Sequence, residues 1–224
     1  PLEANGCVDP DRLAAAIRPD TAMISLIHVN NETGAVHDPA DIANIRDRIN
    51  PKTAIHMDCV QSFGKLETDT TIQRCEMASI SAHKIHGPKG VGALYIRPGV
   101  RIAPLLHGGG QQRGLRPGTE STALIAGFAL AAVRMAALRE QNTVSVRQVR
   151  DALLAGMEGR TSYRILSPEN GYPGILNLSF PGIPSEVMVH AMEREGIYLS
   201  AGSACSSHKK KSSPVLRAMG VDDA

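Results

Sequence analysis

The fold is decided by the stretch Ala22-Met23-Ile24-Ser25-Leu26-Ile27-His28-Val29, which is almost continuously apolar and β-branched. Such a run predicts a strand that is buried on both faces of a parallel sheet. Asp38-Pro39 supplies an N-cap and a first helical residue, which predict a helix to about Ile49, and the next strand is expected over Thr53 to Met57. This strand-helix-strand alternation predicts an α/β fold with a mostly parallel sheet.

Further elements are expected on both sides of this unit. Asp9-Pro10 predicts a short helix that ends near Arg18, and strands are expected over Met77 to Ser81 and Val91 to Ile96. Later in the chain we expect helices over 119–140 and 143–157, a strand over 175–180, a helix over 185–194 and a strand over 197–200. We place a domain boundary inside the first of these helices. Residues 1–130 would then belong to a large domain and residues 131–224 to a smaller α/β domain.

The composition is that of a globular domain. The 224 residues are 42% hydrophobic and 21% charged, and the net charge of +2 gives no general reason to expect nucleic acid binding. No continuous apolar run approaches the roughly 18 residues that cross a bilayer, so we expect no membrane segment. The basic cluster Lys209-Lys210-Lys211 is interpreted as a solvated loop.

The four cysteines, Cys7, Cys59, Cys75 and Cys205, show neither a CxxC pair nor the spacing of a disulfide framework. The sequence therefore predicts no metal site, no disulfide scaffold and a reducing, cytoplasmic compartment. The chain starts at Pro1 without a charged segment followed by an apolar one, so no secretory signal is expected.

Polar residues follow three of the predicted strands. Asn30 and Asn31 come after the first strand, Asp58 and Gln61 after the second, and Lys84 after the third. Ligands of open α/β sheets bind outside the carboxyl ends of the strands. We therefore expect these polar side chains to contribute to one site.

The residues at these strand ends match the needs of pyridoxal phosphate. The cofactor requires a lysine for its aldehyde, a carboxylate for its ring nitrogen and donors for its phosphate. Lys84 supplies the amine, Asp58 the carboxylate, Gln61 a hydrogen bond to the ring oxygen, and Ser81 and His83 the phosphate donors. Each residue taken singly has an ordinary alternative, such as a turn aspartate or a polar loop. Their order and their strand-end placement favour the cofactor site.

Five motifs follow one another along the chain: HVNNETG at 28–34, HMDCVQ at 56–61, SAHK at 81–84, GGGQQRGLRPGTE at 108–120 and SAGSACSS at 200–207. In this order they resemble the signatures of cysteine desulfurases of the NifS/IscS type, which belong to the class V aminotransferases. The resemblance implies the type I, aspartate aminotransferase-like fold and a homodimer. It assigns Lys84 to the covalent bond with the cofactor and Thr119 to the phosphate of the neighbouring subunit's cofactor. It also puts Asn31, rather than Asn30, near the substrate carboxylate.

By the same resemblance the catalytic residues are Lys84, His83 and Cys205. Cys205 lies among small and polar residues, with lysines and His208 just beyond, a setting that favours thiolate over thiol. The implied reaction converts L-cysteine to L-alanine and leaves the sulfur on Cys205 as a persulfide. A sulfur-acceptor or scaffold protein would then take the sulfur for iron-sulfur clusters or thiolation. Cys7, Cys59 and Cys75 are interpreted as inert structural cysteines.

Members of the resembled family begin before Pro1 and continue beyond Ala224 to an arginine that holds the substrate carboxylate. The chain is therefore expected to be an internal piece of an enzyme.

Three alternative functions stay open. A selenocysteine lyase of the same fold fits the same motifs, and so does a non-catalytic fragment of this fold. A cysteine-histidine hydrolase built on Cys205 and His208 is the least supported, because no oxyanion-stabilising group is identifiable.

Overall fold

The structure, a computed structural model, describes residues 2–202 and 213–221. It divides into two compact units. Unit 1 combines Pro1–Arg18, Val29–His37 and Gln141–Ala224, and unit 2 combines Pro19–His28 and Asp38–Glu140. Each unit is described by itself. Cys205, His208 and Lys209-Lys210-Lys211 lie outside the described residues.

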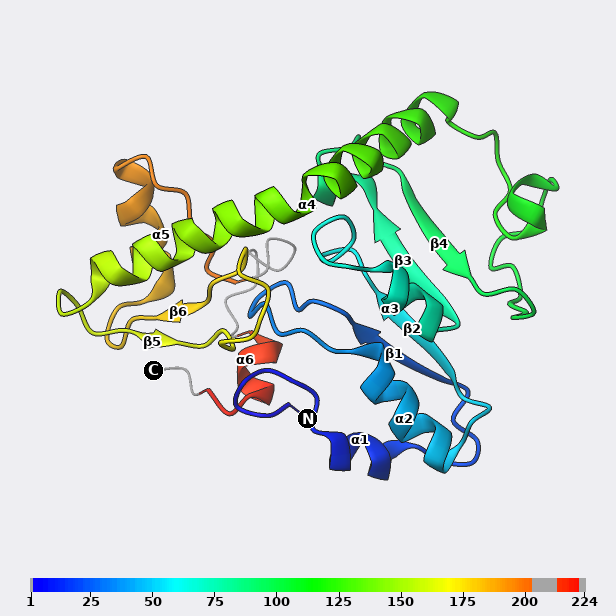
Figure 1. The fold of residues 1–224 in the computed structure, drawn as a ribbon, viewed down its shortest axis with the longest axis horizontal. Coiled ribbons are helices and arrows are strands. Elements are labelled where there is room, and N and C mark those ends of the chain that lie inside the picture. The colour runs from blue at the N-terminus through cyan, green and yellow to red at the C-terminus, as the bar shows by residue number, and fades with distance from the viewer. Residues whose placement is uncertain (1, 203–212, 222–224) are drawn as a thin grey trace. The chain divides into compact units, whose positions relative to one another are not determined.

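Unit 2 contains a four-stranded sheet in the order β1-β2-β3-β4 (Figure 1). The strands are β1 (Met23–Ile27), β2 (Ala54–Asp58), β3 (Met77–Ser81) and β4 (Gly92–Ile96). The first three are parallel and β4 is antiparallel to β3. The connection from β3 to β4 is short and so joins antiparallel neighbours, because a parallel crossover needs a dozen or more residues. Because three of the four strands are parallel and helices connect them, the predicted α/β fold with a mostly parallel sheet is confirmed.

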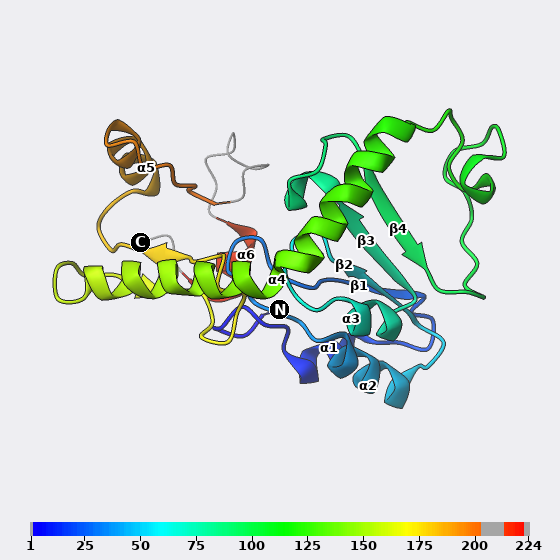
Figure 2. The same ribbon diagram turned by 45° about the horizontal axis from the view of Figure 1, so that its top comes forward.

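Helices cover one face of this sheet. Figures 1 and 2 show α2 (Pro39–Ile49), α3 (Asp69–Arg74) and the first half of α4 on the same side of the strands. Asp38 caps α2 as predicted, because its side chain accepts a hydrogen bond from the Ala40 N–H and Pro39 stands in the first turn. The covered face carries fully buried side chains, among them Ile55, Met57 and Ala78.

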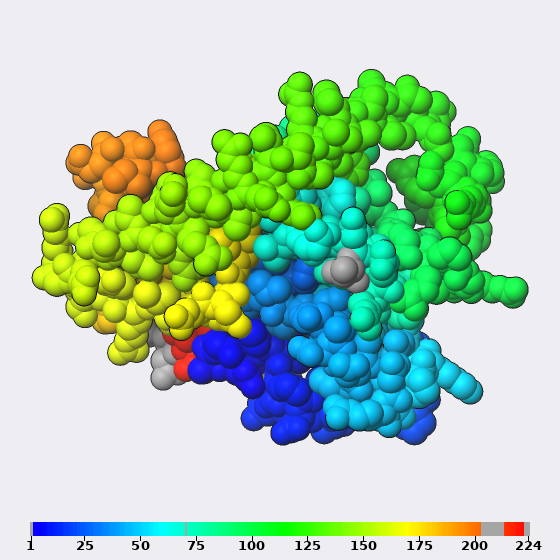
Figure 3. Space-filling view, viewed as in Figure 1, coloured from blue at the N-terminus to red at the C-terminus, as the bar shows by residue number. Residues whose placement is uncertain are grey.

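The helix α4 (Thr122–Met157) is continuous over 36 residues, so the prediction of two helices with a break near residue 141 was wrong. Gln141-Asn142-Thr143 contains no glycine or proline, and weak helix formers alone do not end a helix whose neighbours continue it. Much of its length is exposed in the space-filling view (Figure 3).

Length and composition would allow α4 to cross a membrane. The segment contains no long continuous apolar run, because Arg134 and Arg139 interrupt it. In unit 2, however, Phe128 and Ala131 of this helix are buried in an apolar cluster, and the Arg139 guanidinium lies 2.6 Å from a carboxylate oxygen of Glu67. These contacts are those of a helix that packs on a sheet.

Unit 1 contains α1 (Pro10–Ala16), the end of α4, the strand pair β5 (Arg164–Ile165) and β6 (Leu178–Ser179), α5 (Ser185–Arg194) and α6 (Pro214–Ala218). The strand predicted over 175–180 shrinks to the two residues of β6. The strand predicted over 197–200 was wrong, because that segment is irregular in the structure. A strand needs a hydrogen-bonding partner, and none of the described residues pairs with this segment.

The segment Val29–His37 holds unit 1 together. The side chain of Asn177 donates a hydrogen bond to the Glu32 carbonyl oxygen, and the Ser213 hydroxyl donates to the Glu32 carboxylate. The Tyr172 N–H donates to the Gly34 carbonyl oxygen at 2.8 Å. Gly34 has φ +76°, and a Cβ there would come within 3.0 Å of the Ile175 carbonyl oxygen, so only glycine allows this close approach.

Candidate functional site

The carboxyl ends of β1, β2 and β3 lie at one edge of the sheet, because these strands are parallel. Asp58 ends β2 and Ser81 ends β3, and Asp58 is paired with Ser79 across the two strands. Neighbouring strands are about 4.8 Å apart and two residues along a strand span about 6.6 Å, so the backbones of Asp58 and Ser81 are about 8 Å apart. Within unit 2, the expected gathering of polar residues at one edge is therefore present.

Asp58 takes part in the turn that follows β2. One carboxylate oxygen, Oδ1, accepts a hydrogen bond from the Val60 N–H at 2.9 Å. The side chain is half-buried, and its other oxygen has no hydrogen bond within the described part of the chain. The turn role and the cofactor role are thus compatible, since the turn fixes the carboxylate and leaves one oxygen for a ligand.

Lys84 lies in a short 3₁₀ turn, η1 (Ala82–Ile85), directly after β3. Ala82 and Ile85 are fully buried and pack against Phe128 of α4, which anchors the turn on both sides of the lysine. His86 then adopts a left-handed conformation with φ 63° and ends the turn. Lys84 is half-buried, and its amine makes neither a hydrogen bond nor an ion pair among residues 2–202 and 213–221.

Ser81 and His83 contact one another at the end of β3. The Ser81 hydroxyl lies 2.7 Å from Nδ1 of His83, and the tautomer of the imidazole decides which of the two donates. This contact leaves Nε2 of the exposed His83 ring for a ligand. A hydroxyl and an imidazole N–H are suitable donors to phosphate oxygens.

Lys65 is a neighbour of the site that the sequence analysis missed. Its ammonium group donates a hydrogen bond to Oε1 of Gln61 at 3.3 Å. Burial, and then the positive charge of Lys84, lower the pKa of Lys65, so the two lysines are electrostatic neighbours. The signal in the sequence is the spacing of four residues from Gln61, which brings two side chains together on a helical turn.

The remaining predicted site residues lie elsewhere. Asn31 is exposed and belongs to unit 1, where Asn30 accepts hydrogen bonds from the N–H groups of Glu32 and Thr33 and so forms a turn. Thr119 is exposed in the segment between η2 (Gln111–Gly114) and α4. The roles given to Asn31, Thr119 and Cys205 stay predictions.

The described cysteines have the properties of structural residues. Burial raises the pKa of Cys59 to about 12 and also raises the pKa of Cys75, and both side chains are fully buried. The pKa of the half-buried Cys7 thiol is raised as well, by burial and by the charge of Glu3. Thiols with raised pKa values are poor nucleophiles at neutral pH.

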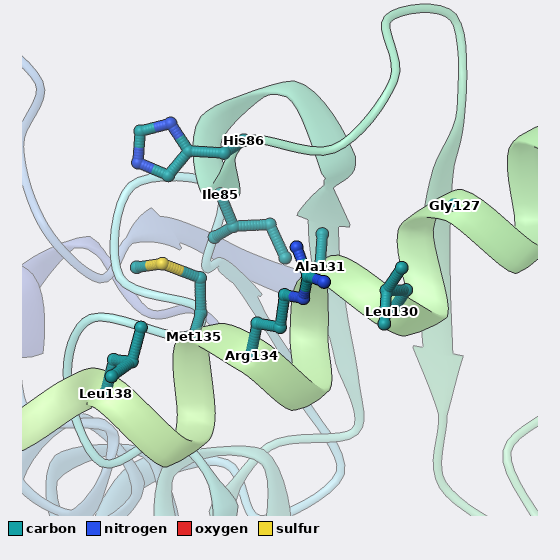
Figure 4. Close-up of a pocket in the computed structure, with 8 residues that line it drawn as sticks. All are labelled: Ile85, His86, Gly127, Leu130, Ala131, Arg134, Met135 and Leu138. Atoms are coloured by element: carbon teal, nitrogen blue, oxygen red, sulfur yellow. The ribbon is translucent and has the colours of Figure 1, made fainter.

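A hollow of about 260 Å³ lies between the turn that carries Lys84 and the helix α4 (Figure 4). Its lining is mainly apolar and consists of Ile85, His86, Gly127, Leu130, Ala131, Arg134, Met135 and Leu138. Lys84, Asp58 and Gln61 do not line it. This hollow is therefore separate from the cluster at the strand ends.

The profile of the Aminotransferase class-V family matches residues 1–222 of the chain. The chain belongs to this family. Among curated relatives, the cysteine desulfurase IscS of Shewanella loihica is 41% identical over 224 residues, which cover 99% of this chain and 54% of that protein. The chain thus spans about half the length of the curated relatives it matches.

Two similar solved structures give the same result for the fold. A NifS-like protein superposes with a TM-score of 0.90 at 36% identity, covering all of this chain and 58% of that one. A structure of SspA in complex with cysteine has a TM-score of 0.79 at 31% identity and covers 61% of that protein. The predicted type I fold and the predicted kinship with NifS/IscS-type proteins are confirmed.

Proposed function

We propose that this protein is a pyridoxal phosphate-dependent cysteine desulfurase, which converts L-cysteine to L-alanine and passes the sulfur to Cys205. The observation that carries the proposal is the half-buried Lys84 in an anchored turn, at the same sheet edge as the carboxylate of Asp58. Its amine has no partner in the described part of the chain. The similarity to the desulfurase IscS and to SspA, which was solved with cysteine, supports this choice of substrate.

The donor set fits the cofactor. Lys84 would hold its aldehyde carbon, the free oxygen of Asp58 its ring nitrogen, and Gln61 its ring oxygen, while Ser81 and His83 would hold its phosphate. When bound, pyridoxal phosphate supplies a conjugated ring that accepts electrons from the substrate α-carbon. Asp58 would keep a proton on the ring nitrogen, because a carboxylate stabilises a neighbouring positive charge.

Lys84 would have a second task, as a base toward the substrate. Its free amine accepts the proton from the substrate α-carbon at Nζ, as a general base. The anchored turn favours this step, because proton transfer needs a base held within hydrogen-bond reach. The thiolate of Cys205 then attacks the substrate sulfur. A sulfur-sulfur bond forms, the carbon-sulfur bond breaks, and its electron pair stays on the carbon skeleton, which becomes alanine after protonation.

The wider setting is proposed from the same kinship. We infer a homodimer in which Thr119 reaches the cofactor phosphate of the other subunit, and in which Asn31 lies near the substrate carboxylate. A sulfur-acceptor or scaffold protein receives the persulfide sulfur for iron-sulfur clusters or thiolation. The cytoplasm is the proposed compartment, and residues 131–224 are the proposed part of the small domain.

A cofactor trap on the complete gene product tests this function. Pyridoxal phosphate should produce a visible absorbance band, and reduction with borohydride should fix the cofactor on the peptide that contains Lys84, as read by mass spectrometry. L-Cysteine should then yield alanine and a persulfide on Cys205. Cys205→Ser should keep the band and lose the persulfide. A complete protein that shows no band would contradict the proposal and favour a non-catalytic member of the fold. Faster turnover of selenocysteine than of cysteine would favour a selenocysteine lyase.

A further inference from the structure

A row of three polar side chains crosses the sheet of unit 2. The imidazole of His56 on β2 lies between two serine hydroxyls on the neighbouring strands. Its Nδ1 is 2.8 Å from Oγ of Ser25 on β1, and its Nε2 is 2.8 Å from Oγ of Ser79 on β3. The row therefore joins all three parallel strands through side chains, in addition to the backbone ladder.

The row lies on the same face of the sheet as the cofactor residues. Side chains alternate between faces along a strand, so His56 and Asp58 point the same way, as do Ser79 and Ser81. The pairing of Asp58 with Ser79 and the contact of His56 with Ser79 agree with this placement. The link from His56 to Ser79 is thus one pleat behind the residues that end β2 and β3.

This link spans the shortest of the three strand pairings. Five residue pairs are in register between β1 and β2 and five between β3 and β4, but only three between β2 and β3. Toward the carboxyl ends, past the Asp58–Ser79 pair, one further backbone hydrogen bond joins the two strands. It runs from the Cys59 N–H to the Ser79 carbonyl oxygen. The carboxylate and the lysine lie on the two sides of this short pairing.

The imidazole can satisfy both contacts in its neutral form. One ring nitrogen then donates and the other accepts, and each serine hydroxyl can take either role. With both nitrogens engaged, the ring has a single favourable orientation, so it acts as a fixed spacer between β1 and β3. A bond between β2 and β3 restrains Asp58 against Ser81 and Lys84, whereas a bond between β1 and β2 does not.

We propose that His56 is a positioning residue for the cofactor site, acting through Ser79. It holds the end of β2 against the end of β3, and so keeps the carboxylate of Asp58 at the distance from Lys84 that a ring bound to both requires. The contact with Ser25 is secondary and serves to orient the imidazole. This inference rests on the proposed function, because it concerns the geometry of the pyridoxal phosphate site.

Two pairs of matched variants in the complete protein test it. In the asparagine variant His56→Asn the amide takes the place of Nδ1 and keeps only the bond to Ser25, whereas in His56→Gln it takes the place of Nε2 and keeps only the bond to Ser79. Ser79→Ala and Ser25→Ala remove the same two bonds from the other side. The readouts are the dissociation constant of pyridoxal phosphate and the pH dependence of the absorbance of the bound cofactor, with the thermal midpoint of the apoprotein as a measure of folding.

We expect Ser79→Ala and His56→Asn to weaken cofactor binding by about fivefold, the effect of one lost hydrogen bond. Both should also raise the pH at which the absorbance changes, because a displaced Asp58 no longer holds a positive charge on the ring beside the protonated nitrogen at Lys84. Ser25→Ala and His56→Gln should stay within about twofold of the unsubstituted protein, with similar losses in thermal midpoint.

Equal losses of cofactor affinity in the variants without the Ser79 bond and in those without the Ser25 bond would overturn the inference. A general contribution to sheet stability would affect both sets alike. An unsubstituted protein that binds the cofactor but tolerates Ser79→Ala in both cofactor readouts would overturn it as well, and would leave the proposed function intact. An unsubstituted protein that does not bind the cofactor would overturn the proposed function, and this inference with it.

Discussion

The two ends of the sheet in unit 2 use charged residues in opposite ways. At the amino ends of the parallel strands, the carboxylate of Glu76 lies 2.8 Å from Arg97 and 3.5 Å from Arg46, and accepts the Ile55 N–H at 2.7 Å. Arg46 also donates to the Thr53 carbonyl oxygen. At the carboxyl ends, Lys84 has no such partner in the described part of the chain and Asp58 keeps one oxygen free.

The difference shows how one sheet separates stability from chemistry. Buried charges stabilise a fold only when they are paired and hydrogen-bonded, as they are around Glu76. Unpaired polar groups weaken a fold but remain available to a ligand, as they do around Lys84. Substitutions at the two ends should therefore change different measurements.

The largest expected effect is at the carboxyl end. Lys84→Ala should abolish the covalent attachment of pyridoxal phosphate and the turnover of cysteine, because no other described residue in the turn has an amine. The free energy of unfolding of the Lys84→Ala apoprotein should differ from that of the unsubstituted apoprotein by less than about 0.5 kcal/mol. Absorbance, borohydride trapping and urea unfolding measure the two effects, with Lys89→Ala as the matched control. A large loss of stability would show that the lysine also supports the fold.

The next largest expected effect is a loss of stability at the amino ends of the parallel strands. Glu76→Ala should lower the free energy of unfolding by about 3 kcal/mol, because it removes the buried carboxylate that pairs with Arg46 and Arg97. The buried guanidinium of Arg46 then keeps only the more exposed carboxylate of Asp47 as a counter-ion. Borohydride should still trap the cofactor on Lys84. Glu67→Ala is the control, since it removes an ion pair with Arg139 that is much more exposed and should cost no more than about 1 kcal/mol. If both variants lost the same stability, the network around Glu76 would have no special role.

The smallest effect concerns Cys59, which follows Asp58 but is buried. Because its pKa is raised from 9.0 to about 12, the folded protein keeps this thiol proton at pH values where the unfolded chain loses it. The stabilisation is therefore complete below pH 9 and is lost as the pH rises from 9 to about 12. Each unit of pH in this window costs about 1.4 kcal/mol.

Cys59→Ala should accordingly lose less stability between pH 8 and pH 10 than the unsubstituted protein does, by about 1 kcal/mol. Urea unfolding of the two apoproteins at both pH values gives this double difference, in which the effect of the smaller side chain cancels. An identical pH dependence would mean that the Cys59 thiol has the same pKa in the folded protein as in the unfolded chain. Cys59 would then belong with the reactive groups of the carboxyl end.

Local signals were sufficient for several elements of this chain. Asp9-Pro10 and Asp38-Pro39 begin helices as predicted, because a capping side chain and a proline act on adjacent residues. A strand around Ile24 was predictable from its apolar run. The predicted burial of both its faces was wrong, because β1 lies at the edge of the sheet and its Met23 and Ser25 are exposed. The break near residue 141 and the strand over 197–200 were wrong, because neighbouring turns and partner strands decide such segments.

By itself, then, the sequence determined the α/β class and the family, since residue types and their order along the chain carry that information. It also predicts the cofactor roles of Asp58, Gln61, Ser81, His83 and Lys84. Only the tertiary structure decided the network around Glu76 and the row through His56. The contacts of Glu76 and the row through His56 join residues at least 21 positions apart, and they exist only once the strands have taken their register.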